Sequence, residues 1–385
     1  MWIGACTSSI GTWMQQMAQA WLVYDLSKNS LYLGIDAFLA QAPIILFSLI
    51  GGVFADRSNR RNLLLVSQYI QMTTAFILTV LVFTNHVQIW HIWCLSFVVG
   101  IAQSFGGPAY MALIPTLVGP EDLNNAIALN SIQFNLARVI GPTLGGLALT
   151  GLGASWCFGL NGISFIAVII SLYTIHIRYI PAKSTEKILT SMKSGIVFIR
   201  QKPGMNALIF LAFSMTLLGV PLLTFLPVFA HDVLKGGPAT FTKLLAFSGA
   251  GSVCGALTVA YLGKLKHQGR TALLMLTLLG FLITGFALSK SVWLSCAVIF
   301  CAGASLMSVF ATISSLVQAI TGDAMRGRVM SVYNVAFRGG MPIGSLVLGS
   351  LIPALTAPVT LALTGSLLVV LALYLLLLDR RVAVL

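Results

Sequence analysis

Two arginines inside apolar sequence carry the clearest chemical signal of this chain. Arg138 and Arg338 each lie in a strongly apolar stretch, and each precedes a proline by four positions, Pro142 and Pro342. A cation at the centre of a membrane helix costs about 2.5–3.5 kcal/mol on insertion scales, so two of them in matching contexts need a shared cause. Two related halves with polar groups near the bilayer midplane are typical of a secondary transporter.

One carboxylate lies at a depth similar to that of these cations. Asp36 is about five residues into its apolar run, and Arg138 is about 20 Å from the cytoplasmic end of its own, at about 1.5 Å per residue. We expect Asp36 to pair with Arg338, or failing that with Arg138. Protonation of Asp36 would then loosen an outer gate. A static structural ion pair is the alternative interpretation.

Polar side chains recur at helical spacing in four of the apolar stretches, and such stripes are costly against lipid. We expect six of them to line a cavity that binds substrate: Gln15, Gln19, Asn135, Arg138, Asn334 and Arg338. The two arginines favour an anionic or acidic solute. The alternative is that these polar faces only form hydrogen bonds between helices.

Composition indicates the elements that position these residues. The chain has 8% charged and 58% hydrophobic residues, whereas soluble domains have about 25% charged residues. About 20 apolar residues cross a bilayer, and on this measure the chain contains about twelve candidate helices. Their predicted ranges are 2–24, 31–55, 63–83, 89–111, 125–150, 156–177, 206–230, 240–262, 272–289, 292–316, 330–353 and 359–378.

One long connection divides this pattern. We expect an amino-terminal six-helix bundle at 1–177, a cytoplasmic linker at 178–205 and a carboxy-terminal six-helix bundle at 206–385. The fold class is therefore all-α, a polytopic membrane protein with two pseudo-symmetric bundles. Within the linker, apolar residues at helical spacing predict an amphipathic surface helix at 187–202.

The cations predict the orientation of the chain. The loops assigned to one side hold most of the Lys and Arg residues, whereas the opposite loops hold only Lys28, Lys235, Lys243 and Lys290. Short cytoplasmic loops are enriched in Lys and Arg, so both termini are expected in the cytoplasm. The net charge of +13 does not indicate nucleic-acid binding, because the cations fall between apolar runs.

The turn between the ranges 31–55 and 63–83 carries a specific motif, Gly52-Val53-Phe54-Ala55-Asp56-Arg57-Ser58-Asn59-Arg60-Arg61. It resembles the signature of the major facilitator superfamily. The resemblance implies that Asp56, with Arg57, Arg60 and Arg61, forms a conformational switch that closes the cytoplasmic side. Asn59 stands where the family has glycine, and we expect it to preserve the turn because asparagine tolerates a left-handed backbone.

A second motif, Gly141-Pro142-Thr143-Leu144-Gly145-Gly146, lies in the helix predicted at 125–150. It is similar to an element found in antiporters and exporters of the same superfamily. Independently of the family, Pro142 removes a backbone donor and bends a helix, while Gly141 and Gly145 allow a neighbouring helix to approach closely. An ordinary packing kink is the alternative.

Further segments resemble one exporter branch of the superfamily, which contains the enterobactin (siderophore) exporter and the macrolide efflux proteins. These segments are Gly11–Gln15, Ala20–Asp25 and Arg326–Ser331. Members usually begin with a basic segment, so a few cytoplasmic residues are expected to be missing ahead of Met1. The resemblance implies a monomeric secondary transporter that exports a small amphipathic molecule, of the drug or siderophore class, by proton antiport and alternating access.

Two rival functions remain open at this point, a proton-coupled uptake symporter and a non-transporting membrane receptor or scaffold. Enzymatic activity is not expected, because the chain has no Walker A loop, no G-x-S-x-G motif and no pair of carboxylates within the apolar runs. The five histidines form no spaced ligand set, so we expect no metal and no cofactor. The expected partners are the solute, protons and the lipid bilayer.

Overall fold

The structure, a computed structural model, describes residues 1–175, 188–262 and 267–384, which form helices and turns without any strand. The chain divides into two compact units, Met1–Thr185 and Glu186–Leu385. Residues 178–187 of the predicted linker lie outside the described part of the chain. The domain boundaries given above stay a prediction.

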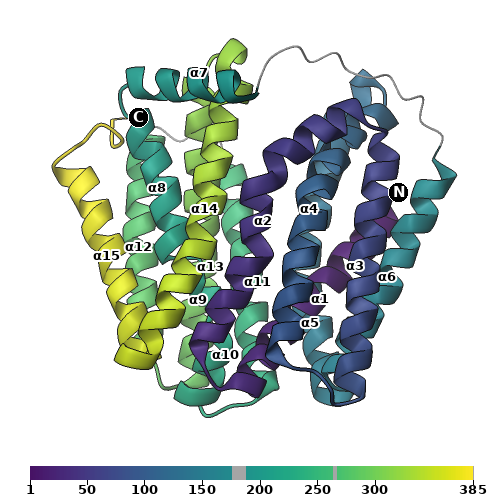
Figure 1. The fold of residues 1–385 in the computed structure, drawn as a ribbon. Coiled ribbons are helices and arrows are strands. Elements are labelled where there is room, and N and C mark those ends of the chain that lie inside the picture. The colour runs from purple at the N-terminus through teal and green to yellow at the C-terminus, as the bar shows by residue number, and fades with distance from the viewer. Residues whose placement is uncertain (176–187, 263–266, 385) are drawn as a thin grey trace. The chain divides into compact units, whose positions relative to one another are not determined.

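In the first unit, long helices pack pairwise (Figure 1). Its elements are α1 (Trp2–Ser27), α2 (Ser30–Arg57), α3 (Arg60–Phe83), α4 (Ile89–Leu117), η1 (Pro120–Asp122), α5 (Leu123–Gly151) and α6 (Ala154–Thr174). α1 packs on α5 and α6, α2 packs on α4, and α3 packs on α4 and α6. Buried Leu64, Leu113, Phe165 and Leu172 belong to one apolar cluster that joins α3, α4 and α6.

The second unit has a related set of helix contacts. Its elements are α7 (Ile188–Gln201), α8 (Met205–Leu218), α9 (Pro221–Thr224), α10 (Leu226–Val228), η2 (Phe229–Val233), α11 (Pro238–Leu262), α12 (Gln268–Leu288), α13 (Val292–Ile320), α14 (Asp323–Leu355) and α15 (Ala357–Leu377). α8 packs on α14, α11 packs on α13, and α12 packs on α13 and α15.

The predicted ranges overlap helices of the structure, and the ends differ by a few residues. Several helices are longer than predicted; the range 89–111 extends to Leu117, and 330–353 begins at Asp323. Hydropathy locates the apolar part of a helix. Helical hydrogen bonding continues into the polar sequence at 323–329, because each backbone group finds its partner within the helix.

The membrane span predicted at 206–230 is present as Met205–Val233, but it is not one regular helix. The structure breaks it into α8, α9, α10 and the π-helix η2. Pro221 and Pro227 each lack the backbone N–H that a continuous helix requires, and Gly219 ends α8.

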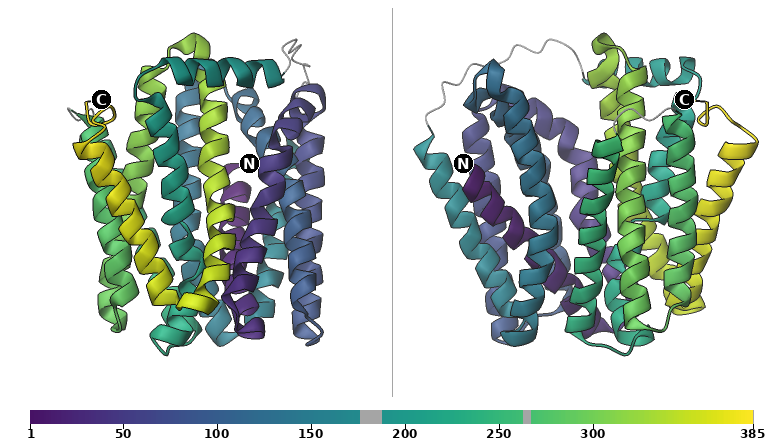
Figure 2. Two further views of the ribbon diagram at one scale, coloured as in Figure 1. Left: turned by 60° about the vertical axis from the view of Figure 1, so that its left-hand side comes forward. Right: turned by 180° about the vertical axis from the view of Figure 1, so that it is seen from behind.

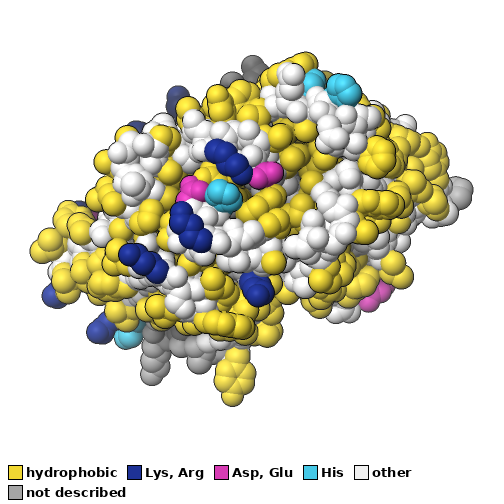
Figure 3. Space-filling view, turned by 90° about the horizontal axis from the view of Figure 1, so that it is seen from below, with side chains coloured by type: hydrophobic (Ala, Val, Ile, Leu, Met, Phe, Trp, Pro, Cys, Tyr) yellow, Lys and Arg dark blue, Asp and Glu magenta, His cyan; other side chains and the backbone are white. Residues whose placement is uncertain are grey.

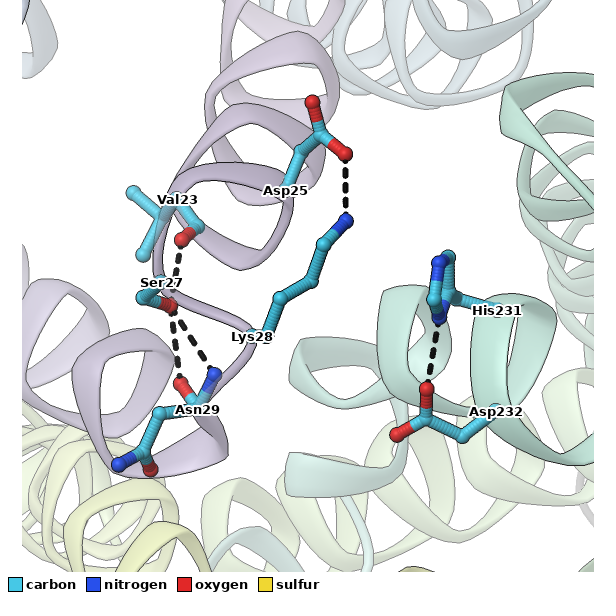
Figure 4. Close-up of polar contacts among 7 residues, drawn as sticks. All are labelled: Val23, Asp25, Ser27, Lys28, Asn29, His231 and Asp232. Atoms are coloured by element: carbon cyan, nitrogen blue, oxygen red, sulfur yellow. Dashed lines mark hydrogen bonds and ion pairs between the residues drawn. The ribbon is translucent and has the colours of Figure 1, made fainter.

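Within η2, Nδ1 of His231 lies 2.7 Å from Oδ1 of Asp232 (Figure 4).

The surface helix predicted at 187–202 corresponds to α7, which lies across the ends of α8 and α14 (Figures 1 and 2). Ile199 is buried, whereas Lys193 and Arg200 are exposed. A Cβ on Gly195 would lie 2.7 Å from the carbonyl oxygen of Arg328. The glycine therefore lets α7 lie directly on the backbone of α14.

Among the described residues, ten helices are long and apolar enough to cross a membrane. α1 and α5 are not in that set, although they have 26 and 29 residues. Both carry polar side chains such as Gln15 and Gln19 on α1 and Asn135 and Arg138 on α5, which lower their mean hydropathy. Large hydrophobic side chains are exposed on many helices, and hydrophobic atoms make up much of the surface in Figure 3.

Candidate functional site

Asp36 is the centre of a buried polar cluster in the first unit. It lies in α2, 8% exposed, and Ser96 of α4 is 6% exposed. Nε2 of Gln19 on α1 donates to Oδ2 of Asp36 and to Oγ of Ser96, both at 2.8 Å. Oγ of Ser96 donates to Oδ1 of Asp36 at 2.6 Å. Two helices, α1 and α4, therefore direct polar groups at the carboxylate of a third, α2, and we call these three residues the Asp36 cluster.

The Asp36 cluster differs from the expected ion pair. In the described part of the chain, Asp36 forms no ion pair with Arg138; its oxygens accept from Gln19 and Ser96 instead. The helix contacts explain this correction: α2, which carries Asp36, packs on α4, whereas α5, which carries Arg138, packs on α1. The pairing of Asp36 with Arg338 would join the two units and stays a prediction.

Gln15 lies one helical turn before Gln19 but has a different neighbour. Its Oε1 accepts a hydrogen bond of 2.6 Å from Nδ2 of Asn161 on α6, and Asn161 is 2% exposed. Oγ of Ser164 in turn donates to Oδ1 of Asn161 at 3.2 Å. The carbonyl oxygen of Gln15 therefore takes part in packing between α1 and α6.

On α5, Asn135 and Arg138 lie one turn apart and are both partly exposed. Nδ2 of Asn135 donates to the carbonyl oxygen of Ser131 at 2.8 Å, while its Oδ1 is buried without a hydrogen-bond partner. Phe134 packs edge-on against Trp13 of α1, with ring centroids 6.0 Å apart. Polar and aromatic groups are therefore adjacent along this part of α5.

Asn334 and Arg338 are both exposed on α14. Aromatic rings accompany them: Phe337 stacks on Tyr333 with centroids 6.0 Å apart, and it lies 4.7 Å from the ring of Phe310 on α13. The residues that the structure describes supply no ion pair to Arg138 or Arg338.

The α2–α3 turn is held by backbone acceptors on other helices. Nη1 of Arg60 donates to the carbonyl oxygen of Ala112 on α4 at 2.9 Å. Nη2 of Arg61 donates to the carbonyl oxygen of Tyr173 on α6 at 3.2 Å, and the guanidinium lies 5.5 Å from that ring. Arg57 is exposed, and the side chain of Asp56 lies outside what the structure describes.

The left-handed backbone expected at Asn59 is wrong. Its φ is −65° and its ψ is 107°, which is an extended conformation. The side chain of Asn59 instead begins α3, because its oxygen accepts from the backbone N–H groups of Arg61 and Asn62 at 3.1 and 3.4 Å. Asparagine serves this turn as a helix cap, a role in which it is among the preferred residues.

The glycines of the α5 motif face α1. A Cβ on Gly141 would lie 2.5 Å from the Cβ of Trp13, and one on Gly145 would lie 2.9 Å from Cγ of Met14. Pro142 lies between them inside the helix, and Gly146 is buried. On α14, a Cβ on Gly340 would lie 2.6 Å from the carbonyl oxygen of Phe213 on α8, so the second unit has the same kind of close contact.

Sequence reasoning found Asp36 and Gln19 but missed Ser96 and Asn161. A single serine or asparagine in an apolar helix does not by itself predict a functional site, because Ser and Asn often form hydrogen bonds between membrane helices.

An ion pair lies at the exposed end of α1, where Nζ of Lys28 is 2.7 Å from Oδ1 of Asp25 (Figure 4).

Known proteins match this chain over nearly its whole length. The enterobactin exporters EntS of Shigella boydii serotype 18 and of Escherichia coli O139:H28 are each 27% identical over 355 residues, which are 91% of this chain and 84% of the relative. A solved bacterial homologue of the human lysosomal transporter Spinster, in an inward-facing and unoccupied conformation, has a TM-score of 0.77 at 15% identity and covers 99% of this chain and 95% of that one.

The nucleoside transporter NupG has a TM-score of 0.69 at 15% identity and covers 97% of each chain, so these two structures show the likeness of fold. The sequence profile of the family described as transmembrane secretion effector matches residues 1–384. The chain therefore belongs to this family of the major facilitator superfamily and is a multi-pass membrane transporter.

Proposed function

We propose that this protein exports a small amphipathic molecule, of the siderophore or drug class, in exchange for protons. The observation that carries the proposal is the Asp36 cluster, a buried carboxylate within an apolar span. Ionisable residues inside membrane spans are rare and mark ion or proton pathways. A carboxylate that exchanges a proton is what an antiporter needs to couple export to the proton gradient.

The contacts within each unit support two pseudo-symmetric six-helix bundles that work by alternating access. α1 packs on α5 as α8 packs on α14, and α2 packs on α4 as α11 packs on α13. α1 and α5 also cross the membrane in this arrangement. Their polar faces line a water-accessible path, because polar side chains are costly against lipid.

The expected class of substrate follows from the side chains proposed to bind it. Arg138 and Arg338 favour an acidic solute, and Trp13, Phe134 and Phe337 provide aromatic surface. Gln15, Gln19, Asn135 and Asn334 add amide groups. The relatives named as enterobactin exporters favour the siderophore class for this chain as well.

The motifs define the moving parts of the proposal. Asp56, Arg57, Arg60 and Arg61 form the cytoplasmic switch, and the contacts of Arg60 with α4 and of Arg61 with α6 connect that turn to its own unit. Gly141, Pro142, Gly145 and Gly146 provide the close contact of α5 with α1. In a bacterial inner membrane, with both termini in the cytoplasm, the monomer binds its solute from the cytoplasmic side.

Transport in membrane vesicles tests the proposal. Everted vesicles that contain the protein are acidified inside by respiration, and enterobactin and a macrolide antibiotic serve as probes. We expect one of them to accumulate, and we expect accumulation to stop with a protonophore or with Asp36→Asn at an unchanged protein level. Accumulation only in right-side-out vesicles would indicate an uptake symporter. A chain that moves neither probe in either orientation would contradict export of this class.

A further inference from the structure

The hydrogen bonds of the Asp36 cluster show which protonation state of Asp36 the cluster accommodates. The amide nitrogen of Gln19 uses its two hydrogens on Oδ2 of Asp36 and on Oγ of Ser96, and the Ser96 hydroxyl uses its one hydrogen on Oδ1 of Asp36. Three donor hydrogens thus meet acceptors only. A carboxylate accepts at both oxygens, whereas a carboxylic acid must donate from one of them. The arrangement is complete for charged Asp36 and cannot persist unchanged once Asp36 binds a proton.

The two oxygens of Asp36 differ as sites for that proton. Oδ1 accepts the shorter bond, 2.6 Å, from a hydroxyl that is nearly inaccessible to water. Oδ2 accepts the 2.8 Å bond from Gln19, whose side chain is partly exposed. A proton from the aqueous phase therefore reaches Oδ2 from the side of Gln19. Once Oδ2 carries a hydrogen, the amide nitrogen of Gln19 can no longer donate to it.

We infer that the side-chain amide of Gln19 rotates when Asp36 is protonated. The rotation changes which atom of Gln19, Oε1 or Nε2, is available to bind the solute. In the charged state, Nε2 faces Asp36, and no described residue donates to Oε1, which is left to accept from a ligand. In the protonated state, Oε1 accepts from Oδ2–H of Asp36, and Nε2 turns outward. Gln19 is thus a specificity-determining residue, and Ser96 is a positioning residue that holds Oδ1.

The inference deepens the proposed function and rests on it. An outward carbonyl oxygen binds a solute through an O–H or N–H donor, and an outward amide N–H₂ group does not. The solute is therefore a hydrogen-bond donor that binds while Asp36 is charged and is released when a proton arrives. This order is the one that an antiporter requires. The proton comes from water on one side of the membrane and returns to water on the other.

The titratable groups nearest to Asp36 along α1 and α4 are not its hydrogen-bond partners in the described part of the chain. α1 carries Tyr24 and Asp25, and α4 carries His91 and Cys94. Among the described residues, none of these four forms a hydrogen bond or an ion pair with Asp36, whose partners are Gln19 and Ser96. The competing response to protonation is a rotation of the Ser96 hydroxyl toward the carbonyl one turn back in α4, a bond that helical serines often form.

Infrared difference spectroscopy of the protein in lipid vesicles, between acidic and alkaline buffer, separates the two responses and needs no solute. We expect a carboxylic-acid band that is lost in Asp36→Asn. We also expect a change in a side-chain amide band that is lost in Gln19→Leu and in Asp36→Asn, but kept in Ser96→Thr, which retains a hydroxyl. Gln15→Leu is the matched control on the same helix, since its amide is bonded to Asn161.

An Asp36 band that titrates without any change in the Gln19 band would overturn the rotation in favour of the serine response. A Gln19 band that still responds to pH in Asp36→Asn would overturn the link between the two residues. The outcome does not depend on transport. If vesicles move no probe but both bands change together, the proposed export fails while the coupling of Gln19 to Asp36 holds.

Discussion

Gly141 of α5 lies against Trp13 of α1, so closely that a Cβ on the glycine would be 2.5 Å from the Cβ of the tryptophan and 2.8 Å from the carbonyl oxygen of Ile10. Gly145 continues the same contact one turn later, against Met14 and Met17. Small residues at this spacing allow two membrane helices to approach to backbone contact. The contact joins the helix that carries Gln15 and Gln19 to the helix that carries Arg138.

We predict that Gly141→Ala destabilises the protein by about 1–3 kcal/mol, because the added methyl group overpacks this contact. Gly151→Ala is the matched control in α5, where a Cβ would meet nothing within 4 Å. Both variants add one methyl group, which meets α1 only at position 141, and the helix interior at 141 also gains more helix propensity than the helix end at 151, so a lower stability of Gly141→Ala reports the packing. Unfolding by detergent titration in mixed micelles measures it, and equal stabilities of the two variants would contradict the contact.

A second prediction concerns α14, where adjacent glycines have opposite surroundings. A Cβ on Gly340 would lie 2.6 Å from the carbonyl oxygen of Phe213 and 2.8 Å from the backbone nitrogen of Leu217, whereas one on Gly339 would meet nothing within 4 Å. We expect Gly340→Ala to lower the thermal unfolding temperature in detergent and Gly339→Ala to leave it unchanged or higher. A loss at Gly339 equal to that at Gly340 would refute the α8–α14 contact.

The helix positions could be predicted because hydropathy is a property of single stretches of sequence. The close contact at Gly141 and Gly145 also follows from local spacing. The partners of Asp36 did not follow, because they depend on which helices pack together: Ser96 becomes a donor to Asp36 only when α4 lies against α2. The break in the range 206–230 was visible in Pro221 and Pro227, but proline inside membrane helices is tolerated elsewhere in this chain, as at Pro142 and Pro342.

A third prediction tests the hydrogen bond between Gln15 and Asn161, 2.6 Å long. A double-mutant cycle with Gln15→Ala and Asn161→Ala should give a coupling energy of about 0.6 kcal/mol and no more than about 1.7 kcal/mol, the range found for such bonds between membrane helices. Pairing Gln15→Ala with Gln103→Ala is the control, because Gln103 donates to Gln71 on α3 at 2.9 Å. Detergent-titration unfolding gives the free energies of unfolding of the wild type and the five variants. A coupling energy no larger than that of the control pair would show that the bond contributes nothing to stability.

The last prediction concerns the contribution of the Arg138 charge to binding of an acidic solute. Arg138 has no ion pair among the described residues, so its guanidinium can form a charge-assisted hydrogen bond with an acidic solute. Losing such a bond costs about 1.5–3 kcal/mol, which corresponds to roughly a tenfold or greater loss of affinity. We expect Arg138→Gln to weaken binding of an acidic probe by at least that factor and to spare a neutral analogue of the same size. Lys290→Gln, an exposed cation between α12 and α13, is the charge-matched control. Equal losses for acidic and neutral probes would show that Arg138 supports the structure rather than the solute.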